Sequence, residues 1–129
     1  MTGRIDAELN LLRQHYAKVD YLAANAMHWF RVEVLKTPDE WSPRGIPVVF
    51  AVTEGHPGAE PYGFFVPEDL NLKGTPPSGK KVPHPPPFEG RWRFLSWKPE
   101  GWHATADVGS GSNLWGWVRS FMHRLREGV

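Results

Sequence analysis

Short apolar runs separated by turn residues decide which fold this sequence can adopt. Residues 27–35 alternate between two sets of side chains with the period of two that is typical of a half-buried strand. Residues 46–53 and 62–66 are further apolar runs, and the glycine- and proline-containing residues 54–61 between them predict a turn. Residues 19–26 are a further short strand or the approach to one. Strands joined by such short links favour an antiparallel meander, in which residues 46–53 pair with residues 62–66.

Amphipathic helices are expected near both ends of the chain. Residues 5–16 carry apolar side chains at spacings of three and four, whereas charged side chains fall mostly on other faces, namely those of Arg4, Glu8 and Arg13. Residues 113–126 form the clearest helix, with Ser112 as its candidate N-cap. Its apolar stripe consists of Leu114, Trp117, Val118, Phe121 and Leu125.

A stretch rich in proline and glycine, residues 71–90, separates the first strands from the rest of the chain. A loop of this length with so many prolines predicts an ordered, extended surface path. Residues 91–97 then resume a strand-like alternation. The sequence therefore predicts one α+β domain over residues 1–129, with an antiparallel meander of about four strands, an N-terminal helix and a C-terminal helix.

The amino-acid composition excludes several kinds of functional site and of binding partner. None of the 129 residues is cysteine, which excludes disulfides, thiolate metal sites and a cysteine nucleophile. The formal net charge is +1, with 15 basic against 14 acidic residues, so nothing favours nucleic acid or an anionic membrane as a partner. No apolar stretch approaches the ~20 residues of a membrane span. The N-terminal residues lack the apolar core of a signal peptide, and we therefore expect a cytoplasmic protein.

Six histidines remain as candidates for metal or acid–base chemistry. No two of them form the helical i,i+4 pair with an intervening glutamate that zinc enzymes use, so we expect neither a metal nor a cofactor. His56 lies in the turn of residues 54–61 and is expected to be exposed. Residues 109–112, GSGS, are expected to be a flexible link into the last helix.

Residues 46–67, IPVVFAVTEGHPGAEPYGFFVP, resemble a strand–turn–strand block of a known family. The block is similar to the third strand, the proline-rich turn and the fourth strand of the ubiquitin-conjugating (E2/UBC) superfamily, with residues 56–61 in the place of the turn. The order of helix, meander, proline-rich loop and helix is similar over nearly the whole chain. The branch that the sequence resembles is prokaryotic E2 family E, so the resemblance implies a bacterial protein with an E2/UBC-like fold.

The resemblance also implies a site. In E2 proteins a His-Pro-Asn tripeptide follows the fourth strand, and the catalytic cysteine follows the tripeptide. Here His84-Pro85-Pro86 is similar to the tripeptide, with proline where asparagine belongs, and Ser96 stands in the place of the cysteine. A serine nucleophile needs an adjacent base. His84 and His103 flank Ser96 in the sequence and are the two candidates.

Two functions follow from the resemblance. In the first, an E2-like enzyme receives a ubiquitin-like modifier from an E1-like activating enzyme, carries it on Ser96 as an oxyester and passes it to an amine. In the second, Ser96 is inert, and a non-catalytic module of the E2-variant or RWD type binds the modifier or its E1-like enzyme. A JAB-type or other deconjugating peptidase is a further partner that such a pathway implies. A small enzyme with an unrelated histidine-based site is a third, weaker alternative.

Overall fold

The computed structural model describes most of the 129 residues, namely 3–24, 26–34, 41–42, 45–56, 58, 63–72, 86–95, 102–105 and 107–126. Its elements follow one another as α1 (Gly3–His15), β1 (Val19–Ala24), β2 (Met27–Val34), β3 (Trp41–Ser42), β4 (Ile46–Thr53), β5 (Phe64–Pro67), β6 (Asn71–Leu72), β7 (Trp92–Leu95) and α2 (Leu114–Arg126). The protein is therefore α+β, with a helix before the first strand and a helix after the last, as predicted.

Five strands form one antiparallel sheet with the order β1-β2-β4-β5-β7. β2 pairs with β4 along its full length and with β1 along most of it. β4 and β5 pair antiparallel, with Val49 opposite Phe65, so the predicted pairing of these two runs is confirmed. The sheet has five strands rather than about four, because both β1 and β7 join it.

A small second sheet joins residues 41–42 to the first two residues of the stretch for which the sequence predicted a loop, residues 71–90. β3 and β6 have two residues each and pair antiparallel, with Trp41 opposite Leu72. Two residues are too few to show a strand alternation, so the pattern of the sequence gives no sign of them. Residues 73–85 of the predicted proline-rich loop lie outside the described residues, and residues 87–90 are bends that lead toward β7.

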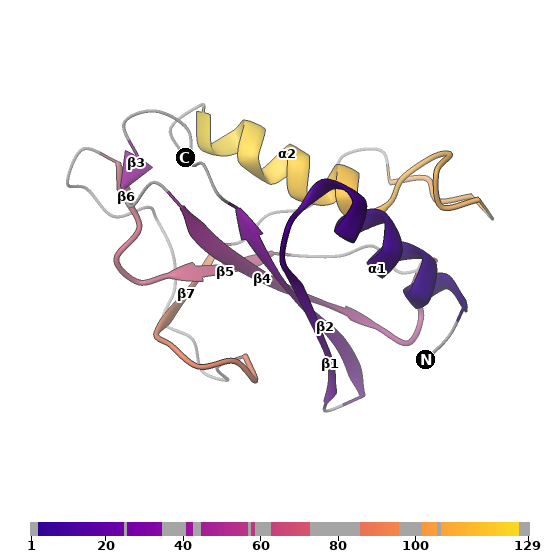
Figure 1. Cartoon of the computed structure of the whole chain (residues 1–129), viewed down its shortest axis with the longest axis horizontal. Coiled ribbons are helices and arrows are strands. Elements are labelled where there is room, and N and C mark those ends of the chain that lie inside the picture. The colour runs from indigo at the N-terminus through magenta and orange to yellow at the C-terminus, as the bar shows by residue number, and fades with distance from the viewer. Residues whose placement is uncertain are drawn as a thin grey trace.

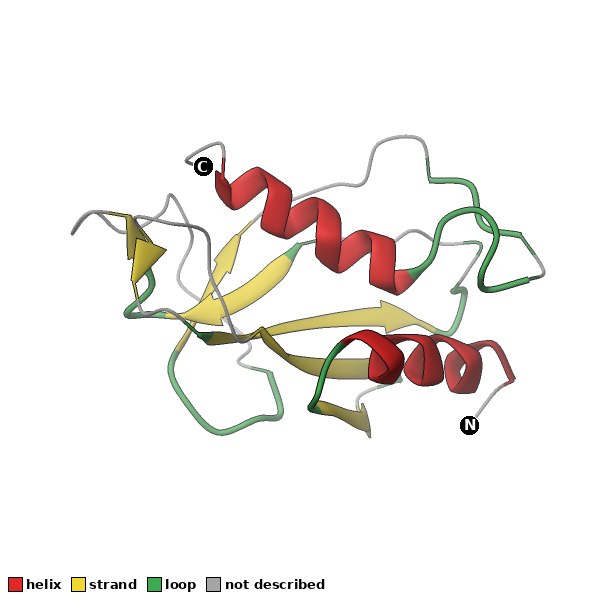
Figure 2. Cartoon of the chain, turned by 45° about the horizontal axis from the view of Figure 1, so that its top comes forward, coloured by secondary structure: helices red, strands yellow, loops and turns green. Residues whose placement is uncertain are grey.

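Both helices lie on the same face of the five-stranded sheet (Figure 1 and Figure 2). Their apolar side chains share one core with the sheet, and the predicted stripe of α2 is buried at Leu114, Trp117, Val118 and Phe121. The side chain of Leu125 lies outside the described part. Each helix has 13 residues, and within the described chain no helix is long and apolar enough to cross a membrane.

The opposite face of the sheet carries a second apolar cluster around Trp29, Val49 and Trp92. Val49 points to this face, while its neighbours Val48 and Phe50 belong to the helix-covered core. β4 is therefore buried on both faces, which explains why its sequence is nearly continuously apolar instead of alternating.

Candidate functional site

The structure describes one of the three residues that the sequence suggested for catalysis. Ser96 and His84 lie outside the described residues. His103 is exposed on the loop before α2, where its backbone pairs with Ser112: the His103 N–H donates to Ser112 Oγ (2.7 Å), and the Ser112 N–H donates to the His103 carbonyl (2.8 Å). The structure thus describes one of the two candidate bases, and the proximity of the three residues stays a prediction.

Buried polar side chains gather elsewhere, at the end of the sheet where β4 leads into a turn. The buried polar or charged residues of the described chain are Glu8, His28, His56 and Asn113. The turn after β4 supplies one residue to each of two groups of polar side chains. Glu54 contacts His28 in one group, and His56 contacts Glu8 in the other. We take this polar cluster as the candidate functional site.

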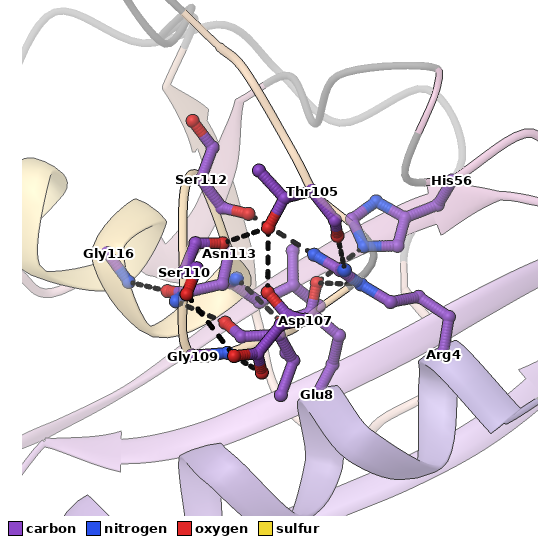
Figure 3. Close-up of polar contacts among 12 residues, drawn as sticks. Arg4, Glu8, His56, Thr105, Asp107, Gly109, Ser110, Ser112, Asn113 and Gly116 are labelled. Carbon is purple, nitrogen blue, oxygen red and sulfur yellow. Dashed lines mark hydrogen bonds and ion pairs between the residues drawn. The ribbon is translucent and has the colours of Figure 1, made fainter.

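Glu8 is the centre of the first network (Figure 3). It projects from the buried face of α1, and its side chain is fully enclosed. Its Oε2 atom accepts hydrogen bonds from His56 Nε2 (2.7 Å) and Arg4 Nε (3.3 Å), and its Oε1 atom accepts one from the backbone N–H of Leu114 (3.0 Å). The guanidinium and the positive end of α2 together compensate the buried negative charge. The sequence placed Glu8 mostly off the apolar face, and this was wrong.

Arg4 connects α1 by hydrogen bonds to the loop that precedes α2. Its Nη1 atom donates to the Thr105 carbonyl (2.6 Å) and its Nη2 atom to the Ser112 carbonyl (3.2 Å). The loop is an ordered hairpin, with Ala104 bridged to Gly111, rather than the flexible link that the GSGS sequence predicted. Gly111 has a φ of +73°, and a Cβ atom there would lie 2.6 Å from the His103 carbonyl, so the hairpin requires glycine at this position.

Asn113, not Ser112, is the N-cap of α2. Asn113 Oδ1 accepts a hydrogen bond from the Gly116 N–H (2.7 Å), which is the bond that defines a cap, and Asn113 Nδ2 donates to the Val108 carbonyl (2.8 Å). Ser112 instead uses its hydroxyl to accept from His103. Glu8 and Asn113 therefore accept from two of the N–H groups that the first turn leaves free, those of Leu114 and Gly116.

His56 is buried between the turn and α1, although its place in a turn predicted exposure. Its side chain has no exposed surface, and its ring lies 5.8 Å from the Trp102 ring, centroid to centroid. Because a carboxylate only accepts, the bond to Glu8 requires a proton on Nε2. The other ring nitrogen, Nδ1, is buried and has no hydrogen-bond partner in the described structure.

The second network consists of Tyr21 on β1, His28 on β2 and Glu54 in the turn. The Tyr21 hydroxyl lies 2.6 Å from His28 Nδ1, and His28 Nε2 lies 3.1 Å from Glu54 Oε1. The contact between His28 Nε2 and Glu54 Oε1 has the distance of an ion pair, but the two atoms do not form a hydrogen bond. His28 is 6% exposed, whereas the Glu54 side chain is 64% exposed.

Burial raises the pKa of Tyr21 above its ordinary value, and the negative charges of Glu54 and Asp6 raise it further. Burial also raises the pKa of Tyr16, and the nearby Arg119 opposes this rise. Both phenols are therefore protonated at neutral pH. A protonated Tyr21 can donate its hydrogen bond to His28 Nδ1, which leaves the imidazole proton on Nε2, facing Glu54.

These pKa shifts predict a loss of stability at alkaline pH. The folded state holds the phenolic protons more tightly than the unfolded chain does, so its advantage is complete below about pH 10 and is lost as the pH rises past that value. Urea unfolding at pH 8 and pH 11 should show a larger loss in the wild type than in Tyr16→Phe combined with Tyr21→Phe. Equal losses in both proteins would contradict the prediction.

The periodicity of the sequence contains a signal for two of these site residues. Glu8 is three residues after Ile5 and four before Leu12, which puts it on the apolar face of α1. His28 is two residues before Phe30, so the strand alternation places it on the buried face of β2. A polar residue at an apolar position of a pattern is the feature that would have pointed to both.

A separate hollow of about 390 Å³ lies on another part of the surface, beside β5 and β7. Its lining mixes two basic and three acidic side chains with apolar ones: Arg31, Pro47, Pro67, Glu68, Asp69, Glu89, Gly90, Arg91 and Trp92. No group of three or more histidine or acidic side chains within the described ranges is arranged as metal ligands would be.

Comparison of the chain with protein-family models, with curated proteins and with solved structures finds no match.

Proposed function

We propose that the protein is an E2-like component of a bacterial ubiquitin-like conjugation pathway, in which Ser96 carries the modifier as an oxyester. The observation that supports the proposal is the arrangement of the elements. One helix before the strands and one after them cover the same face of an antiparallel sheet. This arrangement agrees with the E2/UBC-like fold that the strand–turn–strand block of residues 46–67 resembles.

The position of Ser96 in the chain suits a nucleophile that meets a protein partner. It directly follows Leu95, the last residue of β7, which pairs with Phe64 at the edge of the sheet. In the proposed step Ser96 Oγ attacks the carbonyl carbon of the activated modifier, a base takes the hydroxyl proton, and the thiolate of the E1-like enzyme leaves.

His103 is the candidate base that the structure describes. Its backbone is fixed by two hydrogen bonds to Ser112, while the residue itself is exposed. An exposed imidazole can exchange its proton with solvent after each transfer. His84→Ala and His103→Ala distinguish the two candidate bases, and only loss of the true base should slow the transfer strongly.

The proposal is tested by mixing the protein with an E1-like enzyme, ATP and the modifier. We expect a covalent adduct that resists thiol reductant and is cleaved by hydroxylamine, because an ester and not a thioester has formed. Ser96→Ala should abolish the adduct, Ser96→Cys should give one that reductant cleaves, and Ser110→Ala, an exposed serine in the loop before α2, should change nothing. An adduct that persists in Ser96→Ala would place the nucleophile elsewhere.

The alternative is a non-catalytic module that binds the modifier or the E1-like enzyme. The hollow beside β7 favours it, because a lining of both charges around Trp92 suits a polar protein partner. This function predicts that the wild type binds the modifier without forming any adduct and that Ser96→Ala binds equally well. Substitution of Arg91, in the hollow, should then weaken binding.

A further inference from the structure

We propose that Tyr21, His28 and Glu54 form a nucleophilic triad that accepts an activated acyl group on the Tyr21 hydroxyl. This site is separate from Ser96 in the chain and does not depend on the conjugation function proposed above.

The geometry is that of a nucleophile, a base and a carboxylate beside the base. The Tyr21 hydroxyl lies 2.6 Å from His28 Nδ1, within the distance that proton transfer requires, and the opposite ring nitrogen lies 3.1 Å from Glu54 Oε1, at ion-pair distance without a hydrogen bond. The three side chains come from β1, β2 and the turn after β4, so the fold and not local sequence brings them together. Such a sequence of contacts is the general form of an activated nucleophile.

The pairing of β1 with β2 holds the nucleophile and the base in place. All six residues of β1 pair with β2, and Tyr21 lies opposite Phe30. Phe30 and His28 are two residues apart on β2, so Tyr21 and His28 point to the same face of the sheet. The Tyr21 ring also contacts the rings of Phe30 and His28, at 5.5 and 5.9 Å between centroids. Because these contacts fix the phenol ring, little conformational entropy is lost when it reacts.

The three side chains of the triad differ in how far each is exposed to solvent. His28 is almost completely buried, so water does not compete for its ring nitrogens, whereas Tyr21 is partly exposed and Glu54 is largely exposed. A ligand can therefore reach the phenol, and the carboxylate of Glu54 can stabilise the imidazolium that forms. Asp6 and Glu54 place negative charge near Tyr21, so a neutral or cationic acyl donor is favoured over an anionic one.

The reaction step is an acyl transfer. Tyr21 Oη attacks the acyl carbon, and its proton passes to His28 Nδ1. The bond between the acyl carbon and the leaving group breaks, and the leaving group departs with the electron pair. The product is an aryl ester on Tyr21 and an imidazolium at His28 facing Glu54. A base is necessary because the raised pKa of Tyr21 keeps the phenol protonated at neutral pH.

Tyr16 provides a matched control. It is also a partly buried tyrosine with a raised pKa. Among the described residues, however, no imidazole lies within hydrogen-bond distance of its hydroxyl. Reactivity that depends on burial alone would appear at both tyrosines, whereas reactivity that depends on the triad appears at Tyr21 only.

The test uses the full chain and p-nitrophenyl acetate, a small neutral activated ester. We expect a burst of p-nitrophenolate that approaches one equivalent, and an acetyl group that peptide mass spectrometry locates on Tyr21. Tyr21→Phe should abolish the burst, and Tyr16→Phe should leave it unchanged. His28→Gln should slow acylation about 10²-fold, which is the lower end of the contribution of a general base.

Glu54 is a positioning residue, and its test needs a readout that a purely structural role would not change. Glu54→Gln should slow acylation, and Glu54→Asp should restore most of the rate, because it keeps the carboxylate that stabilises the imidazolium formed at His28. If His28→Gln fails to fold, Tyr21→Phe and Glu54→Gln still decide the question, since both keep the packing of β1 and β2. Absence of a burst in the wild type, or acetylation that persists in Tyr21→Phe at the same rate, would overturn the proposal.

Discussion

Glu8→Ala is expected to lower the free energy of unfolding by about 3–5 kcal/mol, the usual result of removing one partner of a buried ion pair. The substitution leaves three donors without their acceptor at once: the Arg4 guanidinium, His56 Nε2 and the backbone N–H of Leu114. Because the Glu8 side chain has no exposed surface, water does not replace it without opening the contact between α1 and α2.

Urea unfolding monitored by tryptophan fluorescence measures this loss. Asn10→Ala is the matched control, because it lies on the exposed side of the same helix and should change the free energy of unfolding by no more than about 0.5 kcal/mol. Glu8→Gln keeps the shape of the side chain but removes its charge, and it should also destabilise the protein. A loss below about 1 kcal/mol in Glu8→Ala would mean that the network does not hold the two helices together.

Phe121→Ala should have an effect of similar size, about 3–5 kcal/mol, for a different reason. Phe121 is 1% exposed in the core between α2 and the sheet, and its ring stacks on Phe64 of β5 at 4.2 Å between centroids. Phe64 also stacks on Trp117, at 4.6 Å. Removing the Phe121 ring leaves a cavity that these two fixed rings do not fill, so both the transfer free energy and the packing contacts are lost.

The same unfolding measurement applies to Phe121→Ala. Gln14→Ala changes an exposed position in α1 and serves as the control. We expect the control to remain within about 0.5 kcal/mol of the wild type. If Phe121→Ala also stays within about 1 kcal/mol, the stripe of α2 would contribute little to the core.

Periodicity made most of the fold predictable. The helical stripe that includes Phe121 and the alternation through Phe30 each require burial of one face, and the structure buries the described side chains of both. The pairing of β4 with β5 followed from two apolar runs joined by a short turn-rich segment. β3 and β6 were not predictable, because two residues form a strand only when a distant segment supplies the partner.

The candidate site was much less predictable, because its contacts join residues far apart in the sequence. His56 was expected to be exposed since the local pattern shows only a turn, whereas its burial depends on Glu8, which lies 48 residues earlier. Ser112 suited the N-cap of α2 as well as Asn113 did, and the loop hydrogen bond from His103 decided between them. Local sequence shows which side chains are able to bond, but the fold selects the bonds that form.

The hydrogen bond from Leu114 to Glu8 has a consequence for the order of folding. It joins residues 106 positions apart, so it closes a loop that contains most of the chain. Contacts of this sequence separation carry a high entropic cost early in folding and tend to form late. The hairpin of β1 and β2 needs no such closure. While the protein is being synthesised, Glu8 lacks its donor from α2 until Leu114 has emerged. Amide hydrogen exchange should find the first turn of α2 to be among the last segments protected during refolding.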